Sequence, residues 1–333
     1  MRVLLIKTSS LGDVIHSLPA LSDARAAIPD IQFDWVVEEG FAEIPAWHPA
    51  VAQVLPVAIR RWRKNLWQTL RNGEWRRFKA RLREQRYDLV IDAQGLLKSA
   101  WLTRYAQGPV AGLDRDSARE PIASRFYQQR YAVPREQHAV ERTRQLFAQA
   151  LGYSVPAGMG DYGLQRSLLA DEQSLPYLVF LHGTTWPSKH WPEAQWRLLA
   201  EQMSALGWSI RLPWGNAAEK ARAERIAEGL QQAVVLPRLN LAGIAHVIAG
   251  ARACVAVDTG LGHLAAALDV PCISLYGPTL PGRVGAYGRA QRHLCATGPD
   301  AGLGDRHKPC FAGLDAMQVA VELQVLLETT ERS

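Results

Sequence analysis

The first 21 residues, "MRVLLIKTSSLGDVIHSLPAL" (1–21), contain the pattern that decides the fold. Residues 3–6 are a short apolar run typical of a buried strand, and helical periodicity begins near residue 12. A polar loop, which leads to Gly12 and the lone carboxylate of Asp13, joins the two. A strand that passes through a short loop into a helix is the repeating unit of a parallel sheet flanked by helices.

The same alternation continues along the chain. In the first half we expect strands at 3–6, 33–37, 53–57, 89–92 and 110–113, and helices at 12–27, 74–86, 96–106 and 136–150. In the second half we expect strands at 177–181, 209–212, 233–236, 254–257 and 272–275, and helices at 192–206, 217–230, 241–250, 260–268 and 315–330. Residues 152–164, rich in Gly and Pro, are the predicted linker between the two series.

These patterns predict the α/β class, with two Rossmann-like doubly wound domains facing a central cleft. The expected domains are 1–160 and 165–314, followed by a C-terminal helix at 315–333. A length of 333 residues agrees with two domains at roughly 150 residues each. Apolar residues on the last helix predict that it packs in a core: Met317, Val321, Val325 and Leu326. Ligands of such folds bind at the carboxyl ends of the strands.

The composition is that of an ordinary globular protein, with 48% hydrophobic and 21% charged residues. Because no apolar run approaches the ~18 residues that cross a bilayer, and no signal peptide is evident, we expect a cytoplasmic protein. The cysteines, none in a CxxC pair, fit reduced thiols: Cys254, Cys272, Cys295 and Cys310. His293 and His307 lie near the last two, but the spacing is unlike that of a structural zinc site.

Asp13 has two interpretations. A carboxylate at the start of a helix caps free N–H groups and interacts well with the helix dipole, which stabilises the helix by about 1 kcal/mol. Its position at the end of the first strand also faces the expected cleft, where a carboxylate can accept a proton from a bound hydroxyl.

Two turns in the second half have the chemistry of anion-binding sites. "HGTTWPSKHWP" (182–192) offers the hydroxyls and N–H groups of Thr184 and Thr185 and the charge of Lys189, and "AVDTGLGHLAAAL" (256–268) places Asp258, Thr259 and Gly260 before a helix that carries His263. Two such turns suggest a diphosphate. Glu219, at the start of another helix, either binds ribose hydroxyls or is a plain N-terminal glutamate. The absence of GxxxxGK[ST] and GxGxxG disfavours a P-loop or a nicotinamide-dependent enzyme.

The basic residues are concentrated in one segment, residues 60–86, which has a local charge of +9 in a chain of net charge +6. We interpret residues 60–64 as a loop that follows a strand, and tryptophans are interleaved with the charges. A solvated helix face is the usual meaning of a charge run. Arginine forks and indoles also suit nucleic acid or an anionic glycolipid, so these partners remain open.

Taken together, a set of ordered segments resembles the lipopolysaccharide heptosyltransferases, ADP-heptose-dependent glycosyltransferases of the GT-B architecture, and among them the members that add the first heptose. The segments are "MRVLLIKTSSLGDVIHSLPAL", "DWVVEEGF", "VAIRRWRK", "VIDAQGLLKSA", "AREPIASRFY", "HAVERTR", "HGTTWPSKHWP", "LPWG" and "AVDTGLGHLAAAL". The resemblance runs from residue 1 to about 288 and weakens over 289–314, a long loop to which we assign no role.

The resemblance implies an inverting, metal-independent transfer of L-glycero-D-manno-heptose from ADP-heptose to the first Kdo of Kdo2-lipid A, with no cofactor. It implies Asp13 as general base and Lys189 as a second catalytic group. The implied donor-binding residues are Thr184, Thr185, Lys189, Glu219, Asp258, Thr259, Gly260 and His263. The implied acceptor-binding residues are Arg60, Arg61, Arg63, Lys64 and Arg119.

The resemblance also implies a peripheral protein on the inner face of the inner membrane, which it would contact through the basic, Trp-bearing segment, and no nucleic-acid partner. By the same resemblance the C-terminal helix packs toward the first domain. Asp114-Arg115-Asp116, a pattern that metal-using glycosyltransferases of another fold carry, is interpreted as a loop motif. The alternatives are transfer of the second inner-core heptose and a non-catalytic nucleic-acid-binding protein.

Overall fold

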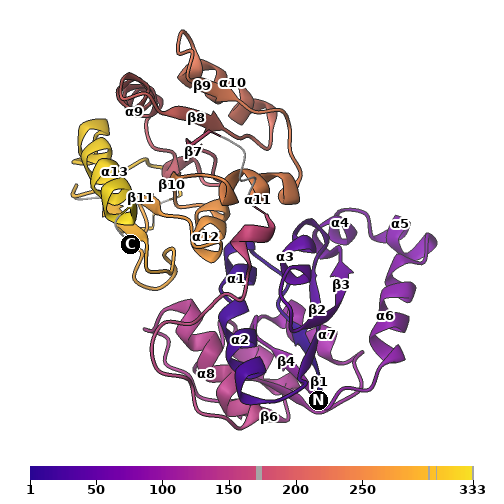
Figure 1. Ribbon diagram of the computed structural model, residues 1–333. Coiled ribbons are helices and arrows are strands. Elements are labelled where there is room, and N and C mark those ends of the chain that lie inside the picture. Colours follow the sequence, from indigo (N-terminus) through magenta and orange to yellow (C-terminus); the bar gives the residue numbers. More distant parts are fainter. Residues whose placement is uncertain (170–174, 299–300, 305, 332–333) are drawn as a thin grey trace. The chain divides into compact units, whose positions relative to one another are not determined.

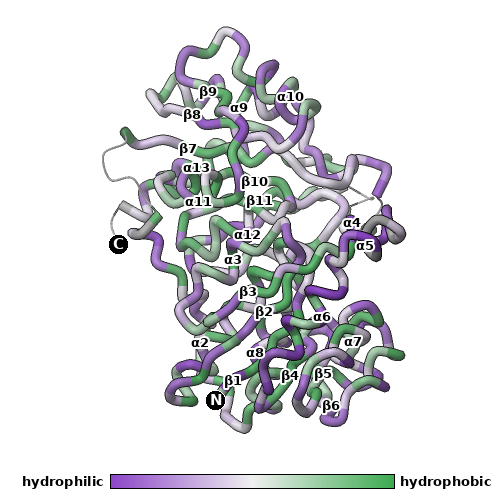
Figure 2. Tube along the Cα trace, turned by 90° about the vertical axis from the view of Figure 1, so that its right-hand side faces the viewer, coloured by the Kyte–Doolittle hydropathy of each residue, from purple (hydrophilic) through white to green (hydrophobic). Residues whose placement is uncertain are grey.

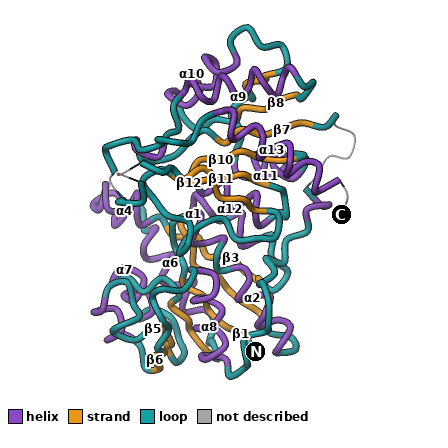
Figure 3. Tube along the Cα trace, turned by 90° about the vertical axis from the view of Figure 1, so that its left-hand side faces the viewer, coloured by secondary structure: helices purple, strands orange, loops and turns teal. Residues whose placement is uncertain are grey.

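The computed structural model describes residues 1–169, 175–298, 301–304 and 306–331, and it divides into two compact units, Met1–Gly163 and Leu164–Ser333 (Figure 1). Each unit contains a six-stranded sheet whose paired strands are all parallel. Helices flank the strands of each sheet, as Figure 3 shows in purple and orange. The predicted α/β class with two doubly wound sheets is therefore confirmed.

The first sheet has the strand order β3-β2-β1-β4-β5-β6. Its strands are β1 (Arg2–Ile6), β2 (Gln32–Glu38), β3 (Val51–Val57), β4 (Leu89–Asp92), β5 (Val110–Leu113) and β6 (Gln129–Tyr131). Its α-helices are α1 (Leu11–Ile15), α2 (Leu18–Ala27), α3 (Glu43–Ala46), α4 (Ile59–Lys64), α5 (Leu66–Arg71), α6 (Glu74–Glu84), α7 (Leu97–Thr103) and α8 (Ala139–Leu151). The direction in which strands are added reverses between β1 and β4, which makes this point the expected ligand site.

Alternation along the strands places apolar side chains on both faces of this sheet. Leu4 and Ile6 belong to one buried cluster with Phe78 of α6 and Leu102 of α7. On the opposite face, Phe33 packs against Phe147 of α8, with ring centroids 5.9 Å apart. The strands therefore have hydrophobic runs, green in Figure 2, because neither face meets solvent.

The second sheet repeats the topology, in the order β12-β11-β10-β7-β8-β9. Its strands are β7 (Tyr177–Leu181), β8 (Ser209–Leu212), β9 (Ala233–Val235), β10 (Ala253–Val257), β11 (Cys272–Tyr276) and β12 (Gln291–Cys295). Its α-helices are α9 (Glu193–Ala205), α10 (Ala217–Ala227), α11 (Leu241–Ala249), α12 (Gly260–Ala267) and α13 (Ala316–Glu331). The reversal lies between β7 and β10.

The structure corrects several predictions. The helix expected at 12–27 is two helices, and residues 60–64, expected as a loop, belong to α4. The segment 289–314, expected as a loop throughout, contains the edge strand β12, and β6 was also missed. Both edge strands carry polar residues, so an apolar-run criterion overlooks them.

The last helix, α13, packs in the second unit with a different face from the one predicted. Val319, Leu323 and Leu326 belong to the buried cluster that also holds Trp196 of α9. Met317 is 62% exposed, and Val321 and Val325 are exposed as well, so only Leu326 of the predicted apolar set is in the core. The expectation that this helix packs toward the first domain stays a prediction.

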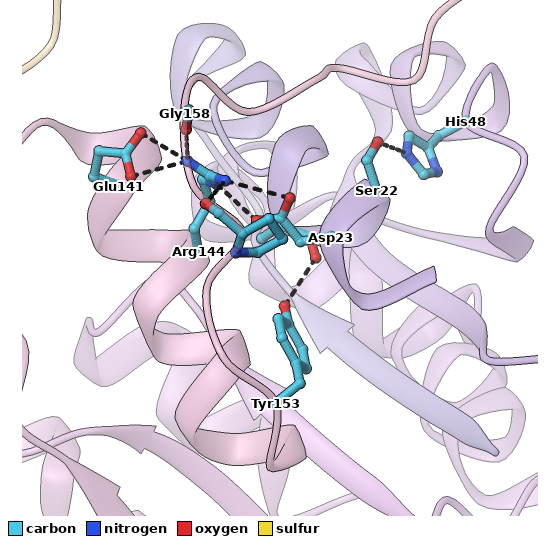
Figure 4. A network of polar contacts seen from close by, with 9 residues as sticks. Ser22, Asp23, His48, Glu141, Arg144, Tyr153 and Gly158 are labelled. Atoms are coloured by element: carbon cyan, nitrogen blue, oxygen red, sulfur yellow. Dashed lines mark hydrogen bonds and ion pairs between the residues drawn. The ribbon is translucent and has the colours of Figure 1, made fainter. Parts of the chain in front are cut away.

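The end of the first unit is held by a buried arginine (Figure 4). Arg144 of α8 forms an ion pair with Asp23 of α2, at 2.6 Å, and donates hydrogen bonds to the carbonyls of Pro156 and Gly158, both at 2.9 Å. Its side chain is almost fully buried, and Glu141 pairs with it as well. Residues 156–158, part of the predicted linker, are thus fixed to the first unit.

Arg144→Ala should lower the free energy of unfolding by about 3–5 kcal/mol, because it leaves the buried Asp23 carboxylate without its cation. Urea unfolding followed by circular dichroism measures this change. The exposed Arg104→Ala is the matched control and should change stability by less than about 0.5 kcal/mol. Equal effects of the two substitutions would contradict the role assigned to Arg144.

Candidate active site

Asp13 lies in the first turn of α1, just after the loop that follows β1. Its Oδ2 accepts hydrogen bonds from the backbone N–H and the hydroxyl of Ser10, at 2.8 and 2.9 Å. The helix-cap interpretation is therefore correct for this oxygen. Within residues 1–169 and the other described ranges, no hydrogen bond to Oδ1 is found. One carboxylate oxygen is fixed by the helix start, and the other remains available to a ligand.

The loop after β4 holds the loop after β1. The side-chain carbonyl of Gln94 accepts hydrogen bonds from the backbone N–H groups of Thr8 and Ser9, at 3.0 and 3.1 Å. Lys98 of α7 donates to the hydroxyl of Ser9 at 3.2 Å. These contacts fix the backbone that leads to Asp13, so the carboxylate is presented by a rigid support.

Two buried charged residues lie at the carboxyl ends of β1 and β4. Lys7 donates a hydrogen bond to the carbonyl of Ala93 at 2.9 Å, and burial lowers its pKa while Asp13 and Asp92 act to raise it. Burial raises the pKa of the Asp92 carboxyl, an effect that hydrogen bonds from Tyr127 and Ser99 oppose. Asp13 and Asp92 are thus the carboxylates that act on the buried amine of Lys7.

The predicted acceptor residues on α4 differ in their partners. Arg61 bridges Glu39 and Glu74, at 3.0 and 2.9 Å, and thereby ties α4 to α6. The guanidinium of Arg60 lies over the ring of Phe41, 5.5 Å from its centroid. In the ion pairs found among the described residues, neither Arg60 nor Lys64 has a carboxylate partner. Their charges are therefore more available to an anionic ligand than that of Arg61.

A pocket of about 390 Å³ opens at this position, between residues 38–41 and the residues of α4. Arg60, Arg61 and Lys64 contribute to its wall, with Glu38 and Glu39 opposite. Arg63 is exposed on the same helix, outside the pocket lining. The pocket offers a basic wall near the carboxyl edge of the first sheet.

Several of the predicted basic residues influence the pKa of Lys98, which lies at this edge of the sheet. Burial lowers the pKa of Lys98, Arg60 lowers it further, Glu38 raises it, and Arg63 and Arg119 also lower it. The chain beside Arg119 is close to the loop after β4, because Glu120 N donates to the carbonyl of Gly95 at 3.0 Å. The predicted acceptor residues thus gather at one edge of the first unit.

In the second unit, the loops after β7 and β10 meet at Asp258. Lys189 Nζ lies 2.5 Å from Asp258 Oδ2, and the hydroxyl of Thr184 donates to the Asp258 carbonyl at 3.0 Å. Thr279, which follows β11, donates to the same carboxylate at 2.7 Å. Thr185 is exposed beside Thr184. The two anion-binding turns predicted from the sequence are therefore neighbours.

Only one of these turns leads directly into an α-helix. α12 begins at Gly260 with Thr259 as its N-cap residue, so the free N–H groups of its first turn lie beside Asp258. His263 is almost buried in this first turn. After Thr184 and Thr185, a short 3-10 helix at Pro187–Lys189 comes first, and α9 begins at Glu193. The helix dipole at this site thus comes from α12.

Glu219 lies in the first turn of α10 and reaches back toward β7. Its Oε2 accepts a hydrogen bond from the N–H of Gly215 at 2.7 Å. A Cβ at Gly183 would lie 2.9 Å from the carboxyl carbon of Glu219, so the absence of a side chain at Gly183 permits this approach. Glu219 is a helix-start glutamate, and it also lies at the carboxyl edge of the sheet, so both interpretations of this residue stand.

Comparisons with known proteins show the family of this chain. Residues 75–312 match Glycosyltransferase family 9 (heptosyltransferase). Lipopolysaccharide heptosyltransferase 1 of Pseudomonas aeruginosa is 69% identical, over 99% of both chains.

The chain belongs to glycosyltransferase family 9.

Solved structures resemble this family 9 chain over nearly its whole length. The Escherichia coli heptosyltransferase WaaC with ADP has a TM-score of 0.91 and 50% identity, and the alignment covers 98% of this chain and 100% of that one. WaaC with ADP-2-deoxy-2-fluoro heptose has a TM-score of 0.87 at the same identity, over 98% and 99% of the two chains. Lipopolysaccharide heptosyltransferase 2 of E. coli is 27% identical over 84% of each chain. The predicted family is confirmed.

Some residues of this glycosyltransferase site were not found from the sequence. Gln94 and Lys98 lie in a segment quoted for its resemblance, yet they had no assigned role. Thr279 comes from a loop without periodicity. A polar residue shortly after a predicted strand was the available signal for Gln94, and no signal marked Thr279.

The groups considered as metal ligands, and the other cysteines, have surroundings that can be described. Among residues 1–169, 175–298, 301–304 and 306–331, no cluster of three or more His, Cys, Asp or Glu side chains could hold a metal ion. Asp114 accepts a hydrogen bond from Ser117 N at 2.8 Å, which is the behaviour of a loop residue. Cys254 and Cys272 are buried, and burial raises the pKa of Cys272 to about 12, so its thiol is protonated.

Proposed function

We propose that this family 9 enzyme transfers L-glycero-D-manno-heptose from ADP-heptose to the first Kdo of Kdo2-lipid A, with inversion at the anomeric carbon and without a metal. The observation that carries the proposal is that each sheet has, at its switch point, charged and polar groups suited to one half of such a transfer. The first has a carboxylate with one available oxygen beside a basic pocket. The second has turns suited to a diphosphate beside Lys189.

The donor half would bind the nucleotide sugar through the second unit. In this proposal Thr184, Thr185, Thr259 and Gly260 offer hydroxyls and N–H groups to the diphosphate, Glu219 accepts from the ribose hydroxyls, and Asp258 holds Lys189 in place. His263 adds a donor in the first turn of α12. The structures of WaaC with ADP and with a fluorinated ADP-heptose analogue support a nucleotide-sugar donor.

The chemical step is a displacement at the anomeric carbon of heptose. Asp13 takes the proton of the acceptor hydroxyl as its oxygen forms a bond to the anomeric carbon of heptose, while the bond from that carbon to the diphosphate breaks. ADP departs with the electron pair. Lys189 and the N-terminus of α12 stabilise the added negative charge, so the residues of the chain can supply the role that a metal has in other transferases.

The acceptor half would bind the anionic sugar of the lipid. Kdo carries a carboxylate and lipid A carries phosphates, which arginine forks bind well. The proposal assigns the binding of these anionic groups to Arg60, Arg63, Lys64 and Arg119. Arg61 supports the shape of the pocket. Since the base belongs to the first unit and the donor turns to the second, the reaction requires both substrates to be brought into line.

The alternative is transfer of the second inner-core heptose. The relative of that type is 27% identical, against 69% for the relative named heptosyltransferase 1. This difference favours the first transfer. The donor half is expected to be similar in both, so the acceptor decides between them.

The experiment that tests the proposal measures ADP release from purified protein, ADP-heptose and de-acylated Kdo2-lipid A, with EDTA or Mg²⁺ and with each substrate omitted. Release that requires both substrates and is unchanged by EDTA is the expected result. Release only with an acceptor that already bears one heptose would select the alternative. Release that EDTA abolishes and Mg²⁺ restores would refute metal independence.

Asp13→Asn should reduce turnover by about 10²- to 10⁴-fold, because asparagine can still accept the hydrogen bonds of Ser10 but cannot act as a base. Asp13→Ala should lose turnover to a similar degree and also weaken the helix start. ADP affinity, measured by calorimetry, should be unchanged in both. Wild-type turnover in Asp13→Asn would reduce Asp13 to a helix cap.

Arg60→Ala combined with Lys64→Ala should raise the acceptor KM by about 10-fold or more and leave the donor KM nearly unchanged, since both residues line the pocket. Steady-state kinetics with each substrate varied in turn separates the two effects. Arg25→Ala combined with Arg104→Ala removes the same charge from exposed positions and serves as the control. If the donor KM rose equally, the pocket would not be the acceptor site.

We further propose that the aromatic surface formed by the basic segment and Trp101 of α7 contacts the membrane that holds the lipid acceptor. Trp75 and Trp101 stack with centroids 5.3 Å apart, Lys79 lies 5.5 Å over Trp75, and Trp67 is 84% exposed. Indoles and basic side chains suit the headgroup region of an anionic bilayer. Among the described residues, no helix is long and apolar enough to span a membrane.

Trp67→Ala combined with Trp101→Ala should reduce binding to vesicles of phosphatidylcholine with phosphatidylglycerol by several-fold, because both indoles are exposed. Co-sedimentation measures the bound fraction, and vesicles of phosphatidylcholine alone show the contribution of charge. The exposed Leu206→Ala is the control. Unchanged sedimentation of the double variant would remove this surface from the proposal.

A further inference from the structure

Two cations that lie far apart in the sequence share one aromatic ring in the second unit. The ammonium of Lys189 lies 4.3 Å from the centroid of the Trp186 ring, and the guanidinium carbon of Arg306 lies 4.4 Å from the same centroid. A cation over an indole is stabilised by the ring quadrupole. Trp186 therefore holds Arg306 in the vicinity of Lys189, although two positive charges repel each other in the absence of an anion.

The chain before Arg306 is attached to the segment that contacts Asp258. Gly302 N donates to the carbonyl of Gly277 at 3.0 Å, and Gly304 N donates to the carbonyl of Pro278 at 2.6 Å. The next residue of that segment is Thr279, whose hydroxyl donates to Asp258. Arg306 is thus joined to the Asp258 site by backbone contacts as well as through Trp186.

The net positive charge at this site is small if Arg306 is left out, although the ammonium of Lys189 can still donate hydrogen bonds to a phosphate. Lys189 is paired with Asp258 at 2.5 Å, so this pair contributes no net charge. The start of α12 contributes only about half a positive charge. A diphosphate carries more than one negative charge, and cleavage of the bond to the sugar adds another. Arg306 is exposed, and among the described residues no carboxylate forms an ion pair with it.

We infer that Arg306 binds the diphosphate of the nucleotide sugar and that Trp186 positions Arg306 and Lys189 together for this contact. The inference rests on the proposed function, because it assigns a further residue to the proposed donor site. Arginine presents a planar fork that binds two phosphate oxygens at once, and it keeps its charge at any working pH. Contact with the β-phosphate strengthens as the sugar bond breaks, so Arg306 contributes to turnover as well as to binding.

The test compares ADP with AMP, which lacks the β-phosphate, by isothermal titration calorimetry on the full-length protein. Arg306→Ala should weaken ADP binding by about 10- to 100-fold, the amount expected for hydrogen bonds to a charged group, and AMP binding by less than about threefold. Arg306→Lys should lie between wild type and Arg306→Ala. ADP affinity should also depend less on salt in Arg306→Ala than in wild type.

Two further variants separate a phosphate contact from a structural effect. Arg289→Ala removes an exposed arginine at the amino end of β12, the opposite edge of the sheet, and should bind ADP as wild type does. Trp186→Leu should weaken ADP binding in the same direction as Arg306→Ala, and Trp186→Tyr should retain most of it, because tyrosine also offers an aromatic face.

Equal weakening of ADP and AMP in Arg306→Ala would overturn the inference, and so would unchanged ADP binding. Both results leave the proposed function intact, provided that wild type binds ADP. Wild-type protein that binds neither nucleotide would instead refute the donor half of the proposed function, and the inference with it.

Discussion

Parallel pairing of one central strand with neighbours on both sides is the constraint on which the rest of this chain depends. β1 pairs with β2 and β4, and β7 pairs with β8 and β10. Because each sheet grows first to one side and then to the other, the loops that follow the two innermost strands diverge and leave space at the carboxyl edge. The chemistry-bearing loops of both units end at these edges.

At these edges, the pairing of charges separates residues that support the site from residues that can bind a ligand. Asp92 is buried and accepts hydrogen bonds from Ser99 and Tyr127, and Arg61 is shared between Glu39 and Glu74. Such paired groups hold neighbouring loops, and for the buried Asp92 the loss of its partners would be costly. The available oxygen of Asp13 and the more exposed cations are the groups that the proposal assigns to substrates.

Most of the fold could be predicted from the sequence because the inner strands are buried on both faces and appear as short apolar runs. The strands at 89–92, 110–113, 177–181 and 209–212 have the predicted bounds. The edge strands β6 and β12 were missed because they are polar. On α13 apolar residues occur on both faces, and the small residues Ala316 and Ala320, which fit closely in the core, carry little signal in a pattern of large side chains.

The candidate site was predictable where a residue directly follows a strand or opens a helix, as Asp13, Thr184 and Asp258 do. It was not predictable where a contact depends on how distant loops meet. Arg306 reaches Trp186 across more than a hundred residues, and nothing in its immediate sequence indicates this. The short helix α4 was taken for a loop because six residues are too few to display helical periodicity.

The hydrogen bonds from Arg144 to residues 156 and 158 also limit where related chains could recombine. If two related chains were joined at residue 152, where the Gly- and Pro-rich stretch begins, residues 156 and 158 would come from the other parent. The buried guanidinium of Arg144 would then have to bind carbonyls of a foreign segment. Gly163 belongs to the same half, since a Cβ there would lie 2.6 Å from the ring of His48. A chimera that exchanges one half for another should therefore join its parents after residue 163, so that each buried contact is inherited whole.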